Sequence, residues 1–211
     1  MVINFYGEGC FKAQSGEFTL LTDPFEKSTG LTPPRLKPNL ILKTLVPFPP
    51  ETFWREEGLK EIVGAGEYNI GEITIKGFFL TQESTEKYSK IIYLVDIEGC
   101  RLCFLGHLSS VPEPSVLEFL EKIDILFIPA GGKPFLEQKL AAKLLKQLEP
   151  KIVIPSFFKI SSLKRKSDDI KDFLQELNGP KGKEIKKQDK FSIRQSGLKD
   201  IVSAEIVVLS A

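Results

Sequence analysis

Short apolar runs separated by turn signals fill the first half of the chain, and Glu72–Phe79 alternates apolar with polar positions, which predicts β-strands joined by tight turns. Val2–Tyr6 ends at Gly7-Glu-Gly9, while Cys10–Gln14 and Glu17–Leu21 flank Ser15-Gly16, a two-residue hairpin signal. Further strands are expected at Asn39–Thr44, Glu61–Val63, Glu72–Phe79, Ile91–Ile97 and Arg101–Leu105. Val46–Pro50 holds three prolines in five residues, which excludes a helix interior or a central strand there.

The second half changes to a helical period between short apolar runs. Helices are expected over Pro114–Lys122, Pro134–Leu148 and Ser167–Leu177. Strands are expected at Ile123–Ile128 and Lys151–Ile154, with two closing strands after a basic loop over Gly179–Lys190, namely Phe191–Arg194 and Ile201–Leu209. Hairpins followed by alternating strand and helix predict a layered α/β domain with mixed sheets. No linker separates two cores, so a single domain over residues 1–211 is expected.

Composition places the chain among ordinary globular proteins, at 42% hydrophobic and 27% charged residues. Sixteen phenylalanines against one tryptophan and one methionine predict a core of Phe, Leu and Ile. A net charge of +1 gives no bulk argument for binding nucleic acid or membranes, and no apolar stretch approaches the ~20 residues that span a bilayer. The start lacks signal-peptide features and the cysteines number three, so a cytoplasmic location without disulfides is expected.

His107 is the single histidine, which excludes any zinc site built on two or more histidines. Cys100 and Cys103 have the spacing of half a zinc site or a redox pair, but they open a predicted strand and point to opposite faces. Buried apolar cysteines are the favoured interpretation. A zinc site from Cys10, Cys100, Cys103 and His107 is the alternative by count.

Landmarks in a fixed order run through most of the chain: Ile3–Phe11, Leu21-Thr-Asp-Pro-Phe25, Gly64-Ala-Gly-Glu-Tyr68, Gly71–Gly77, Arg101-Leu-Cys-Phe-Leu-Gly-His-Leu108, Ile123–Gly132 and Pro150-Lys-Ile-Val-Ile-Pro155. Together they resemble the metallo-β-lactamase superfamily, and most of all its small Zn-dependent hydrolases related to the L-ascorbate-6-phosphate lactonases. The resemblance implies a four-layer αββα sandwich with mixed sheets and a hydrolase that uses a divalent metal.

The metal-binding positions that the resemblance implies depart from the family pattern. The family's His-x-His-x-Asp-His loop falls on Leu45–Pro50, whose Leu and Pro side chains have no donor lone pair. The aspartate position holds His107, and the remaining histidine positions hold Glu8, Gln82 and Phe157. We therefore expect no metal and no other cofactor, and a non-catalytic protein that acts by binding an unknown ligand or protein partner.

A residual pocket is predicted around the former metal position, with candidate residues His107, Glu8, Asp23, Gln82, Glu83 and Ser109. The favoured interpretation is structural, with His107 hydrogen-bonded to Asp23 or to the backbone and filling space. The alternative is a divergent hydrolase in which His107 is the base, oriented by Glu8 or Asp23.

Three other features suggest chemistry less strongly. Ser109, Ser110 and Ser156 lack a Gly-x-Ser-x-Gly elbow, so a serine nucleophile is disfavoured. Lys164–Lys166 with the cations of Lys181–Lys190 form a basic cluster, the basis of a third hypothesis, nucleic-acid binding. The proline-rich segment, with Phe53 and Trp54 after it, is interpreted as a plug of the empty metal cleft or else as a patch for a partner.

Overall fold

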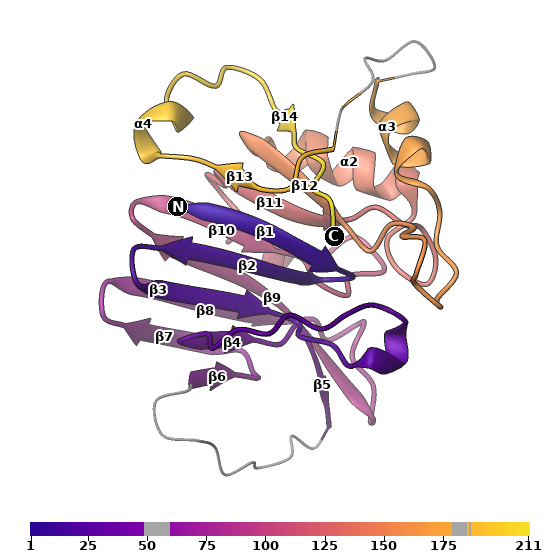
Figure 1. Ribbon diagram of the computed structural model, residues 1–211, viewed down its shortest axis with the longest axis horizontal. Helices are drawn as coiled ribbons and strands as arrows, with labels where there is room; N and C mark the ends of the chain where they lie inside the picture. The colour runs from indigo at the N-terminus through magenta and orange to yellow at the C-terminus, as the bar shows by residue number, and fades with distance from the viewer. Residues whose placement is uncertain (49–59, 179–184, 186) are drawn as a thin grey trace.

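The predicted strands form two β-sheets in the computed structural model, which describes residues 1–48, 60–178, 185 and 187–211 (Figure 1). The first sheet has six strands in the order β13-β1-β2-β3-β4-β6. Strands β1 to β3 are antiparallel, and β4 and β6 continue the sheet in parallel. The bounds are β1 (Val2–Gly7), β2 (Cys10–Ser15), β3 (Phe18–Thr22), β4 (Leu40–Leu42), β6 (Lys60–Ile62) and β13 (Phe191–Ser192).

The second sheet has eight strands, in the order β14-β12-β11-β10-β9-β8-β7 with β5 paired to β9. Its β7 to β10 half is antiparallel, and its β10, β11, β12 and β14 half is parallel. The bounds are β5 (Leu45–Pro47), β7 (Gly66–Ile70), β8 (Ile73–Phe79), β9 (Tyr88–Ile97), β10 (Cys100–Phe104), β11 (Ile125–Pro129), β12 (Ile152–Ser156) and β14 (Glu205–Ile206). Every residue of β11 and β12 is buried, as expected of parallel strands covered on both faces.

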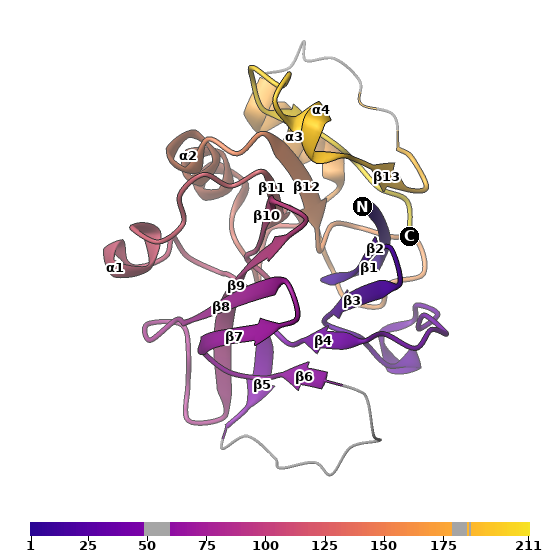
Figure 2. The ribbon, with the colours of Figure 1, turned by 90° about the vertical axis from the view of Figure 1, so that its left-hand side faces the viewer.

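The helices are few and short: η1 (Lys27–Thr29), α1 (Pro114–Leu117), α2 (Gln138–Leu148), α3 (Ile170–Asn178) and α4 (Gln195–Leu198). Figure 2 shows α1 and α2 on the side of the second sheet that faces away from the first. Helix α2 buries the predicted stripe of Leu144, Leu145 and Leu148. The layered α/β fold with two mixed sheets is therefore confirmed. No helix of the described residues is long and apolar enough to cross a membrane.

Phenylalanine rings join the two sheets across the core. Phe5 stacks on Phe11 at 4.8 Å between centroids, Phe11 lies 4.7 Å from Phe127, and Phe127 stacks on Phe104 at 4.3 Å. The first two residues belong to β1 and β2, and the other two to β11 and β10. The predicted Phe-rich core thus holds together the strands whose ends build the site below.

Helix starts are the main error of the sequence predictions. Helix α2 begins at Gln138 and not at Pro134, because the Leu136 amide donates to the Leu108 carbonyl at 2.9 Å. Helix α3 begins at Ile170 and not at Ser167, because the Asp168 amide donates to the Gly131 carbonyl at 2.8 Å. Both bonds tie the chain before the helix to a distant segment, and Glu137 is still extended, with φ of −66° and ψ of 148°.

Three other boundaries also differ from expectation. Helix α1 ends at Leu117 and not at Lys122, whose φ of +54° is left-handed. The predicted strand over Ile201–Leu209 is reduced to Glu205–Ile206. The proline-rich segment begins as β5, an edge strand on β9, where Pro47 costs no central ladder bond.

Candidate ligand-binding cleft

A cleft of about 410 Å³ lies where the ends of strands from both sheets meet. Its lining includes residues that directly follow β1, β3, β4 and β12, together with His107 three residues after β10. The carboxyl ends of strands are where layered α/β folds place their ligands. The polar lining side chains are those of Glu8, Asp23, Thr29, Lys43, His107 and Arg165, and the apolar ones include Phe25, Leu45, Pro47, Phe135 and Phe157.

Asp23, Thr44 and His107 form a chain of hydrogen bonds at the base of this cleft. The Thr44 amide donates to Asp23 Oδ1 at 2.7 Å, and the Thr44 hydroxyl donates to Asp23 Oδ2 at 2.6 Å. Thr44 Oγ1 lies 2.8 Å from His107 Nδ1, whereas Asp23 Oδ2 is 3.9 Å from the same nitrogen. The expected bond between His107 and Asp23 is therefore indirect, because Thr44 lies between them.

Gly106 allows this chain to close. Its φ is +54°, and a Cβ at this position would lie 2.1 Å from Thr44 Oγ1 and 2.2 Å from Thr44 Cβ. Only glycine combines the left-handed conformation with so close an approach of Thr44.

Burial dominates the electrostatics of this group. It raises the pKa of the Asp23 carboxyl above its usual range, although His107 and the two Thr44 donors act in the opposite direction. Burial also lowers the pKa of the His107 imidazole, against the opposing pull of Asp23. His107 is therefore neutral near pH 7.

Arg165 neutralises the other carboxylate of the cleft. Its guanidinium forms a two-pronged ion pair with Glu8, with Nε 3.1 Å from Oε1 and Nη2 2.8 Å from Oε2. Further N–H groups donate to the carbonyls of Phe157 at 2.7 Å and Lys166 at 3.0 Å, and the guanidinium lies 4.9 Å from the centroid of the Phe135 ring. Arg165 thus points into the cleft and away from the predicted basic cluster, of which Lys181, Lys183 and Lys186 lie outside the described residues.

Aromatic rings wall the cleft beside the histidine. Phe135 and Phe157 lie 4.3 Å apart, and His107 meets Phe157 edge-on at 4.9 Å. The backbone around the cleft is strained, since Glu8, Asp23 and Phe157 have φ of +52°, +38° and +58°. Such conformations cost of order 1–3 kcal/mol each and cluster at functional sites.

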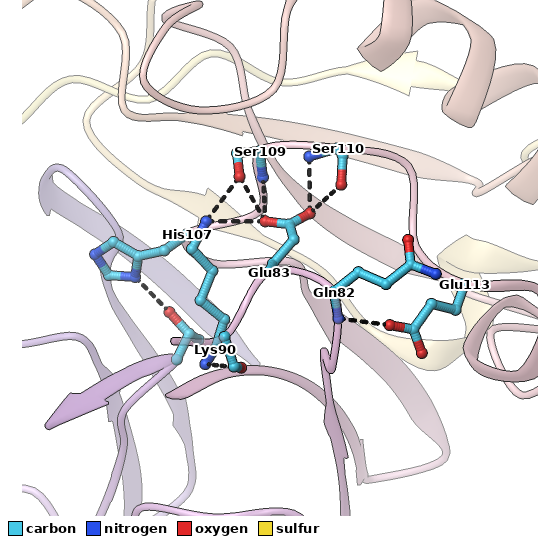
Figure 3. Close-up of polar contacts among 9 residues, drawn as sticks. Gln82, Glu83, Lys90, His107, Ser109, Ser110 and Glu113 are labelled. Carbon is cyan, nitrogen blue, oxygen red and sulfur yellow. Dashed lines mark hydrogen bonds and ion pairs between the residues drawn. The ribbon is translucent and has the colours of Figure 1, made fainter. Parts of the chain in front are cut away.

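Glu83, Ser109 and Gln82 do not line this cleft, contrary to their grouping with His107 in the predicted pocket. Glu83 accepts bonds from the amides and hydroxyls of Ser109 and Ser110 at 2.6–2.8 Å, and from Lys90 Nζ at 2.8 Å (Figure 3). The backbone amide of Gln82 donates to Glu113 at 2.8 Å. In Figure 3 the Gln82 side chain extends away from His107. Gln82 and Glu83 lie outside the cleft because the loop after β8 turns away from it.

The Glu83 cluster is structural in its chemistry. Burial by itself would raise the pKa of Glu83, but the bonds from Lys90, Ser109 and Ser110 outweigh it and hold that pKa below its usual range. A carboxylate of lowered pKa is a poor base for the Ser109 hydroxyl that donates to it. Lys90 Nζ donates to the Ser109 hydroxyl at 2.8 Å, and that hydroxyl donates to Glu83, so Ser109 is held within an ion-pair network, in line with the sequence argument against a serine nucleophile.

The residues present do not fit the metal that the resemblance implies. Within the described part of the chain, no group of three or more His, Cys, Asp or Glu side chains is arranged to hold an ion. Leu45, Pro47 and Phe157 line the cleft without donor atoms, and both Asp23 oxygens already accept bonds from Thr44. Of the proline-rich segment interpreted as a plug, Pro47 lines the cleft and Phe48 is exposed, while Pro49, Pro50, Phe53 and Trp54 lie outside the described residues.

The cysteines form no metal site either. Cys10, Cys100 and Cys103 are free and buried. Burial raises the pKa of Cys100 to about 12 and raises the pKa values of the other two thiols as well. The interpretation as buried apolar side chains is therefore confirmed for all three.

Sequence reasoning missed Thr44, Phe135 and Arg165. Thr44 was visible only as the last residue of a predicted strand. Phe135 fell inside a predicted helix, and Arg165 lies 157 residues from its partner Glu8, so no local pattern could pair them.

Comparisons with known proteins agree on the fold. Residues 2–156 match the family described as the beta-lactamase superfamily domain. A protein from Thermotoga maritima, described as a Zn-dependent hydrolase of the metallo-β-lactamase superfamily, superposes with a TM-score of 0.77 at 21% identity, covering 99% of this chain and 97% of that one. At this identity the likeness concerns the fold alone.

Relatives also match by sequence. UPF0173 protein PF0020 of Pyrococcus furiosus is 32% identical over 101 residues, a match that spans 47% of this chain and 45% of that protein. The chain thus spans less than half the length of that relative. A UPF0173 metal-dependent hydrolase of Lysinibacillus sphaericus is 26% identical over 190 residues, covering 74% of this chain and 84% of that one.

Proposed function

Because this chain belongs to the β-lactamase superfamily while the described residues of its cleft are not arranged to hold a metal, we propose that it is a metal-independent member that binds a small molecule in this cleft. It would carry out no chemistry based on a metal-bound hydroxide. The observation that carries the proposal is the internal neutralisation of the cleft: Arg165 holds Glu8, and Thr44 occupies both oxygens of Asp23.

A divalent ion would have to displace these groups. Its entry at Asp23 would break bonds of 2.6 and 2.7 Å, and its entry at Glu8 would compete with a two-pronged guanidinium. It would gain at most one imidazole nitrogen in return, whereas catalytic zinc has about three protein ligands.

Metal content tests the proposal directly. Untagged protein, expressed in medium with zinc, manganese and iron and then dialysed, should contain far less than one equivalent of any metal by elemental analysis. Adding Zn²⁺, Mn²⁺ or Fe²⁺ should leave the midpoint of thermal unfolding unchanged. An ion present at a hundred times its dissociation constant would instead stabilise the protein by about 2.7 kcal/mol, which is roughly 5–10 °C for a chain of this size.

The Thermotoga maritima relative, carried through the same steps, is the matched control for metal retention. Stoichiometric metal in this chain, with a thermal shift that His107→Ala removes, would refute the proposal.

One observation favours a second function, a metal-independent hydrolase with His107 as its general base. Nδ1 of the imidazole is bonded to Thr44, so its Nε2 is the nitrogen left for a water or substrate in the cleft. Turnover of lactones or phosphoesters that survives a chelator and disappears in His107→Ala would support this function. Turnover that persists in His107→Ala would exclude it. Glu137→Gln, at an exposed ion pair with Lys133, is the control variant.

A further inference from the structure

We propose that Thr44 is a positioning residue that holds His107 in the tautomer with the proton on Nδ1, so that Nε2 accepts a hydrogen bond from the ligand of the cleft. The ligand class that follows is a neutral molecule with an O–H or N–H donor beside an aromatic ring. The ligand half rests on the proposed function, whereas the tautomer is a property of the protein alone.

The number of protons available in the Asp23–Thr44–His107 chain fixes the direction of its hydrogen bonds. A threonine hydroxyl has one proton, and here that proton goes to Asp23 Oδ2 at 2.6 Å. Thr44 Oγ1 can then meet His107 Nδ1 at 2.8 Å only as an acceptor, so Nδ1 must carry a proton. In a neutral imidazole with Nδ1 protonated, Nε2 has a lone pair and no proton.

The Nε2 edge of the ring faces the cleft. His107 lines the cleft with its side chain 19% exposed, and within the described part of the chain Nε2 has no hydrogen-bond partner. The ring's other neighbours, Phe135 and Phe157, meet it edge-on and offer neither a lone pair nor an N–H. A bare acceptor beside two phenyl rings suits a planar molecule that donates one hydrogen bond.

The charges of the cleft disfavour an anionic ligand. The Arg165 guanidinium donates two hydrogen bonds to Glu8 and one to each of two backbone carbonyls. Lys43 forms an ion pair with Glu61 at 2.9 Å. A carboxylate or phosphate would therefore compete with built-in partners, and it would also approach the lone pair of Nε2, which repels it.

The tautomer can be read directly because the chain has one histidine. Protein labelled with ¹⁵N-histidine gives one pair of imidazole nitrogen signals in a long-range ¹H–¹⁵N NMR spectrum at pH 7.5. We expect Nδ1 as the protonated nitrogen and Nε2 as the bare one. Thr44→Ser keeps the hydroxyl and should keep this tautomer, whereas Thr44→Val should reduce the preference about five- to tenfold, the change that one hydrogen bond of about 1–1.4 kcal/mol supports.

If Asp23 were protonated, its carboxyl would donate to Thr44 Oγ1 and the Thr44 hydroxyl would donate to His107 Nδ1. The proton of the neutral imidazole would then lie on Nε2. That spectrum in the wild-type protein would overturn the proposal, and so would a tautomer unchanged in a folded Thr44→Val. The wild-type result stands even if a variant fails to fold.

Phenol, anisole and benzoate test the ligand half on the same sample. They share a phenyl ring, and only phenol is a neutral donor. Phenol should shift the Nε2 signal at millimolar concentrations, while anisole and benzoate should not. Equal shifts with phenol and anisole, no shift with phenol, or a larger shift with benzoate would overturn the ligand class and leave the tautomer result intact.

Discussion

Replacing Gly106 by alanine should destabilise the protein far more than replacing Gly16 by alanine, although their backbones are alike. Gly106 has φ of +54° and Gly16 has φ of +55°, so both variants carry the left-handed cost of about 1 kcal/mol. The new methyl group at Gly16 would meet no atom within 4 Å. At Gly106 it would lie 2.1–2.5 Å from three atoms of Thr44, which is buried and cannot swing aside.

Relieving this overlap requires a backbone shift that adds about 1–3 kcal/mol. Urea unfolding should therefore give a loss of about 1 kcal/mol for Gly16→Ala and about 2–4 kcal/mol for Gly106→Ala. In thermal unfolding the excess corresponds to roughly 2–12 °C for a chain of this length. Equal losses in the two variants would refute the argument that Gly106 is required by the approach of Thr44.

Two further predictions concern the charged groups of the cleft. Arg165→Met leaves the partly buried Glu8 without its partner, so the free energy of unfolding in urea should fall by about 2–3 kcal/mol. Lys166→Met, at an exposed neighbour, should change it by less than about 0.5 kcal/mol. Similar values for both variants would contradict the assigned role of the ion pair. Burial lowers the pKa of His107, so the unfolded chain takes up a proton first as the pH falls, and the wild type should lose stability between about pH 7 and pH 5 relative to His107→Gln. Parallel stability profiles of these two proteins over that range would show that His107 does not titrate as inferred.

The strands and the fold family could be predicted from the sequence because their signals are local or ordered along the chain. The alternation of β8 and the apolar runs of β11 and β12 each match their own burial. The starts of α2 and α3 could not be predicted, since the Leu136 and Asp168 amides bond to segments far away in the sequence.

The site was predicted in part. Glu8, Asp23 and His107 do meet in one cleft, because each follows a strand and the ends of strands from both sheets converge there. Glu83 and Ser109 pair with each other instead, since five donors satisfy the Glu83 carboxylate away from the cleft. The contact between Thr44 and His107 joins residues 63 positions apart, and no local sequence pattern predicts such a contact.

The strained backbone at Glu8, Asp23 and Phe157 has a consequence for protein engineering. These three turns are left-handed, and in the described part of the chain the side chains around them form no metal-binding set. A designer who replaces Leu45, Pro47 and Phe157 by histidines would therefore begin from a backbone already bent around a cavity. Arg165 would be the group to remove in the same step, because a guanidinium and a divalent cation repel each other.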